Sequence, residues 1–549
     1  MLWRFQLQPC YNSIRHLWLS IAIQVLGANR FFVFFKKSLS CIALTTNLFP
    51  MRITTLLGLL CIGVSVHAQQ NFQAEALEIG KERLDDFVAF LSLPNDGKDK
   101  AQLEQNKAWS EASLQRYGFT TTTLETSAFP LVLAHLEVSK ELPTVALYLH
   151  LDGQAVDFSK WAQSSPWVPV FKQQQKGQWT PVDWKTLTDD ALEEVRIFAR
   201  SASDDKGPFM MLLNALEILK RQHRQPAFNI KVILDYEEEQ SSPGLPEAVA
   251  RYKKALAADL LLILDGPVHA SGAPTLVFGN RGIATLTLTT YGPKTPQHSG
   301  HYGNYIPNPA LNLSQLLASM KDAQGRVTIP GFYDGITLDA ATKKILAAVP
   351  QEEAGIRQRT KIIAVDAVGT TYQESLQYPS LNLRGLQSGW VGAEKRTIIP
   401  ATAVAEIDIR LVLESKPERL ITLIKNHIAQ QGYTVFDHEP SDAERLQNDK
   451  IVRLNYGIHY PAFRTPVNSK EGQWVAAILT NYFGAAPVQI RTSGGSVPIS
   501  PFVNQLGVPA VGLPTVNLDN NQHSPNENLR LGNYFRGIEL FTTLFGTKF

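Results

Sequence analysis

Short, almost wholly apolar runs recur along the first half of the chain. Three of them are Val145–Leu151, Ile230–Leu234 and Leu260–Leu264. Strands that are buried on both faces have this pattern, as in a parallel sheet covered by helices. A helix-like segment, Pro208–Arg221, lies between the first two runs. This alternation predicts an α/β domain with a mostly parallel sheet flanked by helices.

The pattern changes in the second half of the chain. Ala284–Thr290 and Val404–Val412 alternate between apolar and polar residues, which is typical of half-exposed antiparallel strands. Helix-like stretches occupy Asn308–Ala323 and Pro417–Gln431. We therefore expect a smaller α+β domain inserted into the first one. The α/β pattern returns around Ala510–Pro514, near the end of the chain.

The N-terminal region has the layout of a secretory signal peptide. Met51 and Arg52 are followed by an apolar run of 14 residues, Ile53–Val66, and then by a small-x-small exit at Ala68. The run is short for a membrane span, although a retained anchor is the alternative. We expect translation to start at Met51 and cleavage to follow Ala68, which makes residues 1–50 an upstream extension. The protein would be exported, to a periplasm or the outside, with no stable membrane insertion afterwards.

Charge and cysteine content exclude several classes of function. The net charge of the 549 residues is +2, but residues 1–68 hold six of the 52 basic residues and none of the 50 acidic ones. The remainder is mildly acidic, so a nucleic-acid partner is not expected. Cys10, Cys41 and Cys61 all lie in this first segment. The body of the chain therefore has neither a disulfide framework nor a cysteine nucleophile.

Residues that can bind metal ions lie at the end of each buried run and at two further places. They are His150 and Asp152 at the end of the first run, Glu237–Glu239 after the second, Asp265 after the third, Asp204 and Asp205 before the helix, and His523 near the C-terminus. In open α/β sheets, ligands bind at the carboxyl ends of the strands, so these side chains should converge. Crowded, desolvated carboxylates repel one another, and one or two divalent cations would remove that penalty. Imidazoles with carboxylates suit zinc, with manganese or cobalt as substitutes.

Each motif also has an ordinary structural explanation. An aspartate before a helix is commonly an N-cap, and a run of glutamates is commonly a solvated turn. Several separate strand and turn ends that all supply metal-ligand residue types favour a metal site over these explanations.

The motifs occur in the order His-x-Asp, Ser-Asp-Asp-Lys-Gly, Glu-Glu, Asp, His-Ser-Gly, Gly-Gly-Ser and His. This order, with the segments HLDGQAVD, SDDKGPFM, HSGHYGN and NNQHSPNE, resembles the M20 metallopeptidases, and above all their carnosinase-like dipeptidase branch. The resemblance covers roughly residues 75–549. It implies a phosphorylase/hydrolase-like α/β fold with an inserted lid and dimerisation domain, and a homodimer.

The resemblance divides the chain further and implies two zinc ions per subunit. Residues 69–279 and 461–549 would form the catalytic domain, and residues 280–460 the lid. The ligands would be His150 and Asp265 for one ion, Glu239 and His523 for the other, and Asp204 as the bridge between them.

The same resemblance implies roles for residues beside the ions. Asp152 would orient His150. Glu238 would be the general base, taking a proton from a metal-bridging water and passing it to the leaving amine. A cis peptide bond is expected between Asp204 and Asp205.

Four further residues would bind the substrate. His298 would stabilise the oxyanion by reaching into the partner subunit's site. Arg410, with Thr397, would bind the substrate carboxylate, for which the planar guanidinium is suited. Ser496 would line the pocket. On its own, Arg410 could equally be a strand-face ion pair and His298 a surface-turn histidine.

The leading hypothesis is an exported dizinc peptidase that acts on dipeptides or short peptides, as a dipeptidase or carboxypeptidase. One alternative uses the same machinery on N-acyl amino acids. Structurally similar aminopeptidases fit less well, because of the large insertion and the 33-residue step from Asp265 to His298. An inactive binding protein is disfavoured because every ligand and Glu238 are present.

Overall fold

The computed structural model describes residues 71–549 of the chain. The expected signal peptide and its cleavage site lie outside these residues. Among the helices described, none has both the length and the apolar character needed to cross a membrane.

A mixed eight-stranded sheet contains all three of the predicted buried runs. Its order is β1-β2-β7-β3-β8-β20-β9-β19. The strands are β1 (Thr120–Leu124), β2 (Leu131–Leu136), β7 (Asn229–Asp235), β3 (Thr144–His150), β8 (Leu260–Ile263), β20 (Ala510–Gly512), β9 (Thr275–Val277) and β19 (Val488–Ile490). The four central strands, β7, β3, β8 and β20, are parallel, whereas β2 pairs antiparallel with both β1 and β7. The predicted α/β fold is confirmed, with its parallel part at the centre of the sheet.

Alternate residues of β3 enter two different hydrophobic cores. Val145, Leu147 and Leu149 belong to one core, and Ala146 and Tyr148 to the other. The first core includes side chains from α3 (Gln73–Glu82), α4 (Leu84–Leu91), α5 (Lys100–Gln115), α7 (Lys206–Arg221), α17 (Lys470–Phe483) and α19 (Leu531–Phe545). The second includes side chains from α8 (Leu245–Arg251), α9 (Lys253–Leu256) and α18 (Ser500–Leu506). Helices on both faces therefore explain why Val145–Leu149, the middle of this strand, has only hydrophobic residues.

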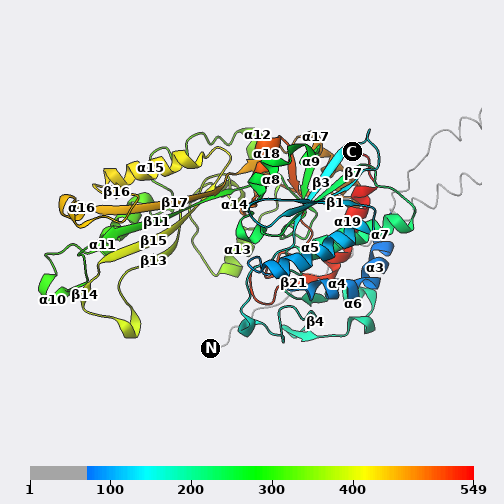
Figure 1. Ribbon diagram of the computed structural model, residues 1–549, viewed down its shortest axis with the longest axis horizontal. Coiled ribbons are helices and arrows are strands. Elements are labelled where there is room, and N and C mark those ends of the chain that lie inside the picture. Colours follow the sequence, from blue (N-terminus) through cyan, green and yellow to red (C-terminus); the bar gives the residue numbers. More distant parts are fainter. Residues whose placement is uncertain (1–70) are drawn as a thin grey trace, which may run out of the picture. The chain divides into compact units, whose positions relative to one another are not determined.

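A second, five-stranded sheet has the order β13-β15-β11-β17-β16. Its strands are β13 (Asn382–Gln387), β15 (Thr402–Leu411), β11 (Gly282–Tyr291), β17 (Ile451–Tyr460) and β16 (Thr434–Phe436), and Figure 1 shows the long ones side by side. Its core includes residues of α11 (Pro309–Met320) and α15 (Pro417–Gln430). Because one face packs on these helices and the other is more open, β11 and β15 show the predicted alternation. We keep residues 280–460 as the proposed inserted domain.

A third, four-stranded sheet was not predicted from the sequence. Its order is β21-β6-β4-β5, with β21 (Asn528–Arg530), β6 (Arg196–Phe198), β4 (Val170–Gln175) and β5 (Gln178–Pro181). The antiparallel pair β21–β6 places the segment after His523 beside the segment that leads to Asp204. This sheet therefore brings together two loops that are more than 300 residues apart in the chain.

The remaining elements of six residues or more are helices of the second half of the chain. They are α12 (Ala340–Ala348), α13 (Glu353–Thr360) and α16 (Asp442–Gln447).

Candidate metal centre

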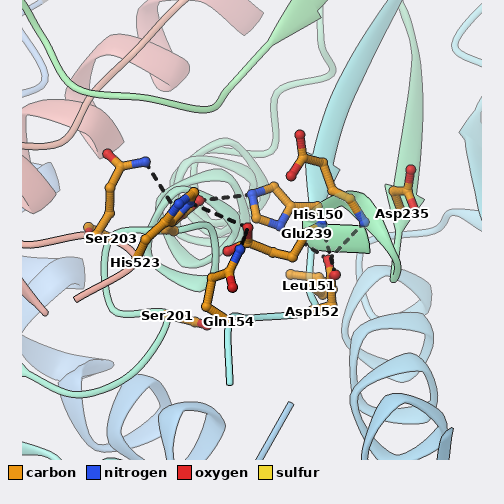
Figure 2. Close-up of polar contacts among 12 residues, drawn as sticks. His150, Leu151, Asp152, Gln154, Ser201, Ser203, Asp235, Glu239 and His523 are labelled. Atoms are coloured by element: carbon orange, nitrogen blue, oxygen red, sulfur yellow. Dashed lines mark hydrogen bonds and ion pairs between the residues drawn. The ribbon is translucent and has the colours of Figure 1, made fainter. Parts of the chain in front are cut away.

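His150 is the last residue of β3 and is buried against Asp152. The His150 Nδ1 atom lies 3.3 Å from Asp152 Oδ1. The same carboxylate accepts backbone N–H bonds from Glu238 at 3.2 Å and from Glu239 at 3.0 Å. Asp152 therefore fixes both the imidazole ring and the glutamate turn after β7, and Figure 2 shows these groups together. With Nδ1 directed to the Asp152 carboxylate, Nε2, which faces Asp204, is the nitrogen that a cation would bind.

Asp204 lies between two histidines. Its Oδ1 is 2.9 Å from His150 Nε2, and its Oδ2 is 3.0 Å from His523 Nε2. The His523 Nε2 atom is also 3.3 Å from Glu239 Oε2. The predicted cis peptide bond between Asp204 and Asp205 is present.

Two clusters of potential ligands share Asp204. One consists of His150, Asp204 and Asp265, and the other of Asp204, Glu239 and His523. Within each cluster the ligand atoms lie within 4.8 Å of one another. The structure thus brings together all five residues that the resemblance implied, in the same two groups.

The electrostatics of the protein alone are unfavourable here. Burial, followed by repulsion from Asp204, raises the pKa of Glu239 to about 7 and that of Asp265 to about 6. Burial also raises the pKa of Glu238 well above its usual range. A hydrogen bond to Asp204 raises the pKa of His523 to about 9. Imidazole and carboxylate donors crowded in this way fit two divalent cations, which would replace protons as the compensating charge.

Two amide side chains that the sequence analysis did not single out steady the ligands. Gln154 Nε2 donates to Glu239 Oε2 at 2.7 Å, and Gln522 Nε2 donates to Asp204 Oδ2 at 3.3 Å. Gln154 lies in the segment HLDGQAVD and Gln522 in NNQHSPNE, which also contain proposed metal ligands. This position was the only signal in the sequence that could have pointed to them.

The contacts of Lys206 and Gly207, the first two residues of α7, explain the sequence Asp-Lys-Gly at this point. Lys206 Nζ donates to the backbone oxygens of Phe90 at 3.0 Å and Leu93 at 2.7 Å, which ties the start of α7 to the end of α4. Burial lowers the pKa of Lys206 and raises that of Asp205. A Cβ atom at Gly207 would collide with the Ala202 backbone oxygen and would lie 2.7 Å from a Leu529 methyl carbon. Only glycine fits at this position without moving the Asp204 loop.

A cavity of about 410 Å³ lies elsewhere, in the second half of the chain, but the ligand clusters open into a different one, of about 330 Å³. Glu238, Asp265 and His523 line it, together with Arg410 and Ser496. The Arg410 Nη1 atom donates to Ser496 Oγ at 2.7 Å. The proposed base, both clusters and the proposed carboxylate-binding arginine therefore surround one space large enough for a small peptide.

His298 and Thr397 are not among the described residues that line this cavity. His298 is exposed at the end of β12 (Gln297–His298), where its Nδ1 accepts the Gly300 N–H at 3.0 Å. Thr397 precedes β14 (Ile398–Ile399), which pairs with β12, and its backbone oxygen accepts the Ser299 N–H. The two lie side by side outside the lining of this cavity, and their roles stay predictions.

Comparison with known proteins identifies the family. Residues 168–546, more than half of the chain, match peptidase family M20/M25/M40. The chain belongs to this family. It is therefore a hydrolase of the M20 metallopeptidase type, acting on peptide bonds, as the motifs predicted.

Individual relatives include two dipeptidases and a metallo-carboxypeptidase of the M20 family. The chain is 28% identical to the Beta-Ala-His dipeptidase of Mus musculus over 425 residues, which cover 76% of this chain and 79% of that one. It is 27% identical to the Cys-Gly metallodipeptidase of Schizosaccharomyces pombe over 421 residues, 75% and 82% of the two chains. An M20 family metallo-carboxypeptidase structure from Sulfolobus solfataricus superposes with a TM-score of 0.70 at 25% identity, covering 84% of this chain and 99% of that one.

Replacing Gly207 with alanine should destabilise the protein by about 1–3 kcal/mol, the usual cost of overpacking, because the Asp204 loop must move. Chemical denaturation measures this directly. Gly355→Ala is the matched control, since Gly355 lies within α13 and its Cβ would meet only the end of a flexible arginine, at 3.3 Å. A Gly207→Ala protein as stable as this control would contradict the close contact between Gly207 and the Ala202 backbone oxygen.

Proposed function

We propose that this protein is a dizinc dipeptidase that hydrolyses the amide bond of small peptides. The observation that carries the proposal is the pair of histidine–carboxylate clusters sharing Asp204 at the edge of a cavity that also contains Glu238 and Arg410. The names of the mouse and fission-yeast relatives, both dipeptidases, support dipeptides as substrates.

His150, Asp204 and Asp265 would hold one ion, and Asp204, Glu239 and His523 the other. When bound, the ions supply Lewis-acid polarisation of the scissile carbonyl and lower the pKa of water. Zinc suits this set of donors, with manganese or cobalt as substitutes.

Glu238 would move protons, and its surroundings support this role. Its backbone N–H is held by Asp152, while its side chain lines the cavity, whereas the neighbouring Glu239 faces His523. Glu238 would take a proton from the attacking water and deliver it to the leaving amine. Burial raises its pKa, which suits a group that must accept and then release a proton.

Arg410 would bind the substrate carboxylate. Its Nη1 is anchored on Ser496, and its nearest acidic group, Asp408, is 3.9 Å from Nε, so the guanidinium is only loosely paired. A planar guanidinium binds carboxylates with two parallel hydrogen bonds. Binding of the free carboxylate at the end of a peptide favours an exopeptidase.

His298 and Thr397 would act on the site of a partner subunit in a homodimer. The support is their joint position on the β12–β14 pair, where His298 is exposed rather than directed at the cavity of its own chain. There His298 would donate to the oxyanion, and Thr397 would assist in binding the carboxylate.

The main alternative is hydrolysis of N-acyl amino acids, which carry the same free carboxylate. A second alternative is a carboxypeptidase that takes longer peptides, which the similarity to the metallo-carboxypeptidase of Sulfolobus solfataricus favours. An inactive binding protein does not explain why Glu238 lines the same cavity as residues of both clusters. Export through the segment Met51–Ala68 remains part of the proposal.

Glu238→Ala should lower kcat on dipeptides by about 10²–10⁴-fold, the usual contribution of a general base, while bound zinc stays unchanged. Glu237→Ala is the matched control, because the Glu237 carboxylate accepts the Phe129 N–H at 2.8 Å and does not line the cavity. Rates are measured on a panel of dipeptides and N-acetyl amino acids. The wild-type enzyme should hydrolyse dipeptides faster than N-acetyl amino acids, and faster turnover of the acetyl compounds would establish the alternative. A Glu238→Ala enzyme that keeps its activity would refute the role of Glu238.

Mixing a His298→Ala chain with a Glu238→Ala chain should restore activity if His298 acts across the dimer. In the mixed dimer, the site with an intact Glu238 receives an intact His298 from the partner, so about half of the wild-type kcat returns. Each parent dimer alone should stay nearly inactive. An isolated mixed dimer without any rescue would argue that the sites are independent.

A further inference from the structure

The carboxylate of Glu527 is fully buried and accepts five hydrogen bonds. Oε1 accepts the backbone N–H groups of Ser203 at 3.0 Å and Asp204 at 3.1 Å, and also the Ser203 hydroxyl at 3.0 Å. Oε2 accepts from Arg200 Nη1 at 2.8 Å and from the Ser201 N–H at 3.0 Å. Because every one of these neighbours is a donor, the group is bound as a carboxylate.

These bonds hold the backbone of the loop that carries Asp204. Without the carboxylate, three buried N–H groups of this loop would lose their acceptor, which is costly away from water. The Asp204 N–H is itself one of the three, so its direction sets where the Asp204 side chain leaves the backbone. Glu527 therefore acts on Asp204 through the main chain.

The same residue is covalently linked to a second ligand. Glu527 follows His523 by four positions, and it immediately precedes β21, which pairs with β6. Its backbone oxygen accepts the Ala199 N–H at 3.1 Å. Side chain and main chain of one residue thus attach the His523 loop to the Asp204 loop.

We propose that Glu527 is a positioning residue that sets the spacing between Asp204 and His523, and so the affinity of the Asp204–Glu239–His523 cluster for its metal ion. It lines neither the cavity nor either ligand cluster among the described residues, so its effect is indirect. The proposal rests on the proposed function, since it requires that the clusters bind metal. Partners of metal ligands typically contribute 10–100-fold to metal affinity.

The test is a zinc titration of the metal-free full chain against a competing chelator. Glu527→Gln keeps the shape of the side chain but replaces one carboxylate oxygen with an NH₂ group. That group cannot accept hydrogen bonds from the donors that face it. It should bind the ion of the Asp204–Glu239–His523 cluster about 10–100-fold more weakly. The ion of the other cluster should be weakened less, because that cluster shares Asp204 but not the His523 loop. Its kcat should fall at low zinc and recover when zinc is raised, with KM little changed, which a general loss of structure would not produce.

Ser203→Ala tests the same link with a milder change, in case Glu527→Gln does not fold. It removes one donor to Glu527, and should weaken zinc binding at the Asp204–Glu239–His523 cluster several-fold. Ser201→Ala is the matched control, because the Ser201 hydroxyl accepts from Asn95 Nδ2 at 2.9 Å and only its backbone N–H contacts Glu527.

The outcomes separate the two proposals. A wild-type chain that binds no zinc would overturn the proposed function and this inference with it. A wild-type chain with two zinc sites and a folded Glu527→Gln chain with the same two affinities would overturn the role of Glu527 alone. If Glu527→Gln does not fold, a Ser203→Ala chain that binds zinc as Ser201→Ala does would overturn it equally.

Discussion

Repulsion among buried carboxylates is the constraint on which this structure depends. Asp204, Glu239 and Asp265 come from different turns and strand ends, yet their oxygens meet within two small clusters. Burial and mutual repulsion raise the pKa of Glu239 to about 7 and that of Asp265 to about 6. Such a gathering of acids is stable as anions only with a compensating positive charge, and two imidazoles beside them suit divalent metal ions.

The rest of the fold delivers these groups to one place. The parallel strands β3 and β8 end beside each other, which brings His150 near Asp265. The four-stranded sheet then brings the Asp204 and His523 loops together through the β21–β6 pair. Asp152, Gln154, Gln522 and Glu527 add hydrogen bonds that orient individual ligands. A large α/β scaffold thus determines the position of a few atoms.

The sequence predicted those parts whose signal is local. Almost wholly apolar strands indicated a sheet covered on both faces, and β3 contributes to a core on each side. The five proposed ligands could be singled out because each matches a family motif, and because His150, Glu239 and Asp265 lie at or after strand signals while Asp204 precedes a helix signal. The four-stranded sheet was missed because β4 and β5 are short and mostly polar, so their pairing depends on distant segments. Glu527 was missed as a positioning residue because the groups that donate to its carboxylate are mainly backbone N–H groups, which no residue type encodes.

Calorimetric titration of the metal-free protein with zinc tests most directly whether these clusters hold two metal ions. We expect two ions per chain. We also expect Asp204→Ala to weaken both sites, because that carboxylate is common to both, whereas Glu239→Ala should weaken only one. A single ion in the wild-type protein, or one site of unchanged affinity in Asp204→Ala, would contradict the account.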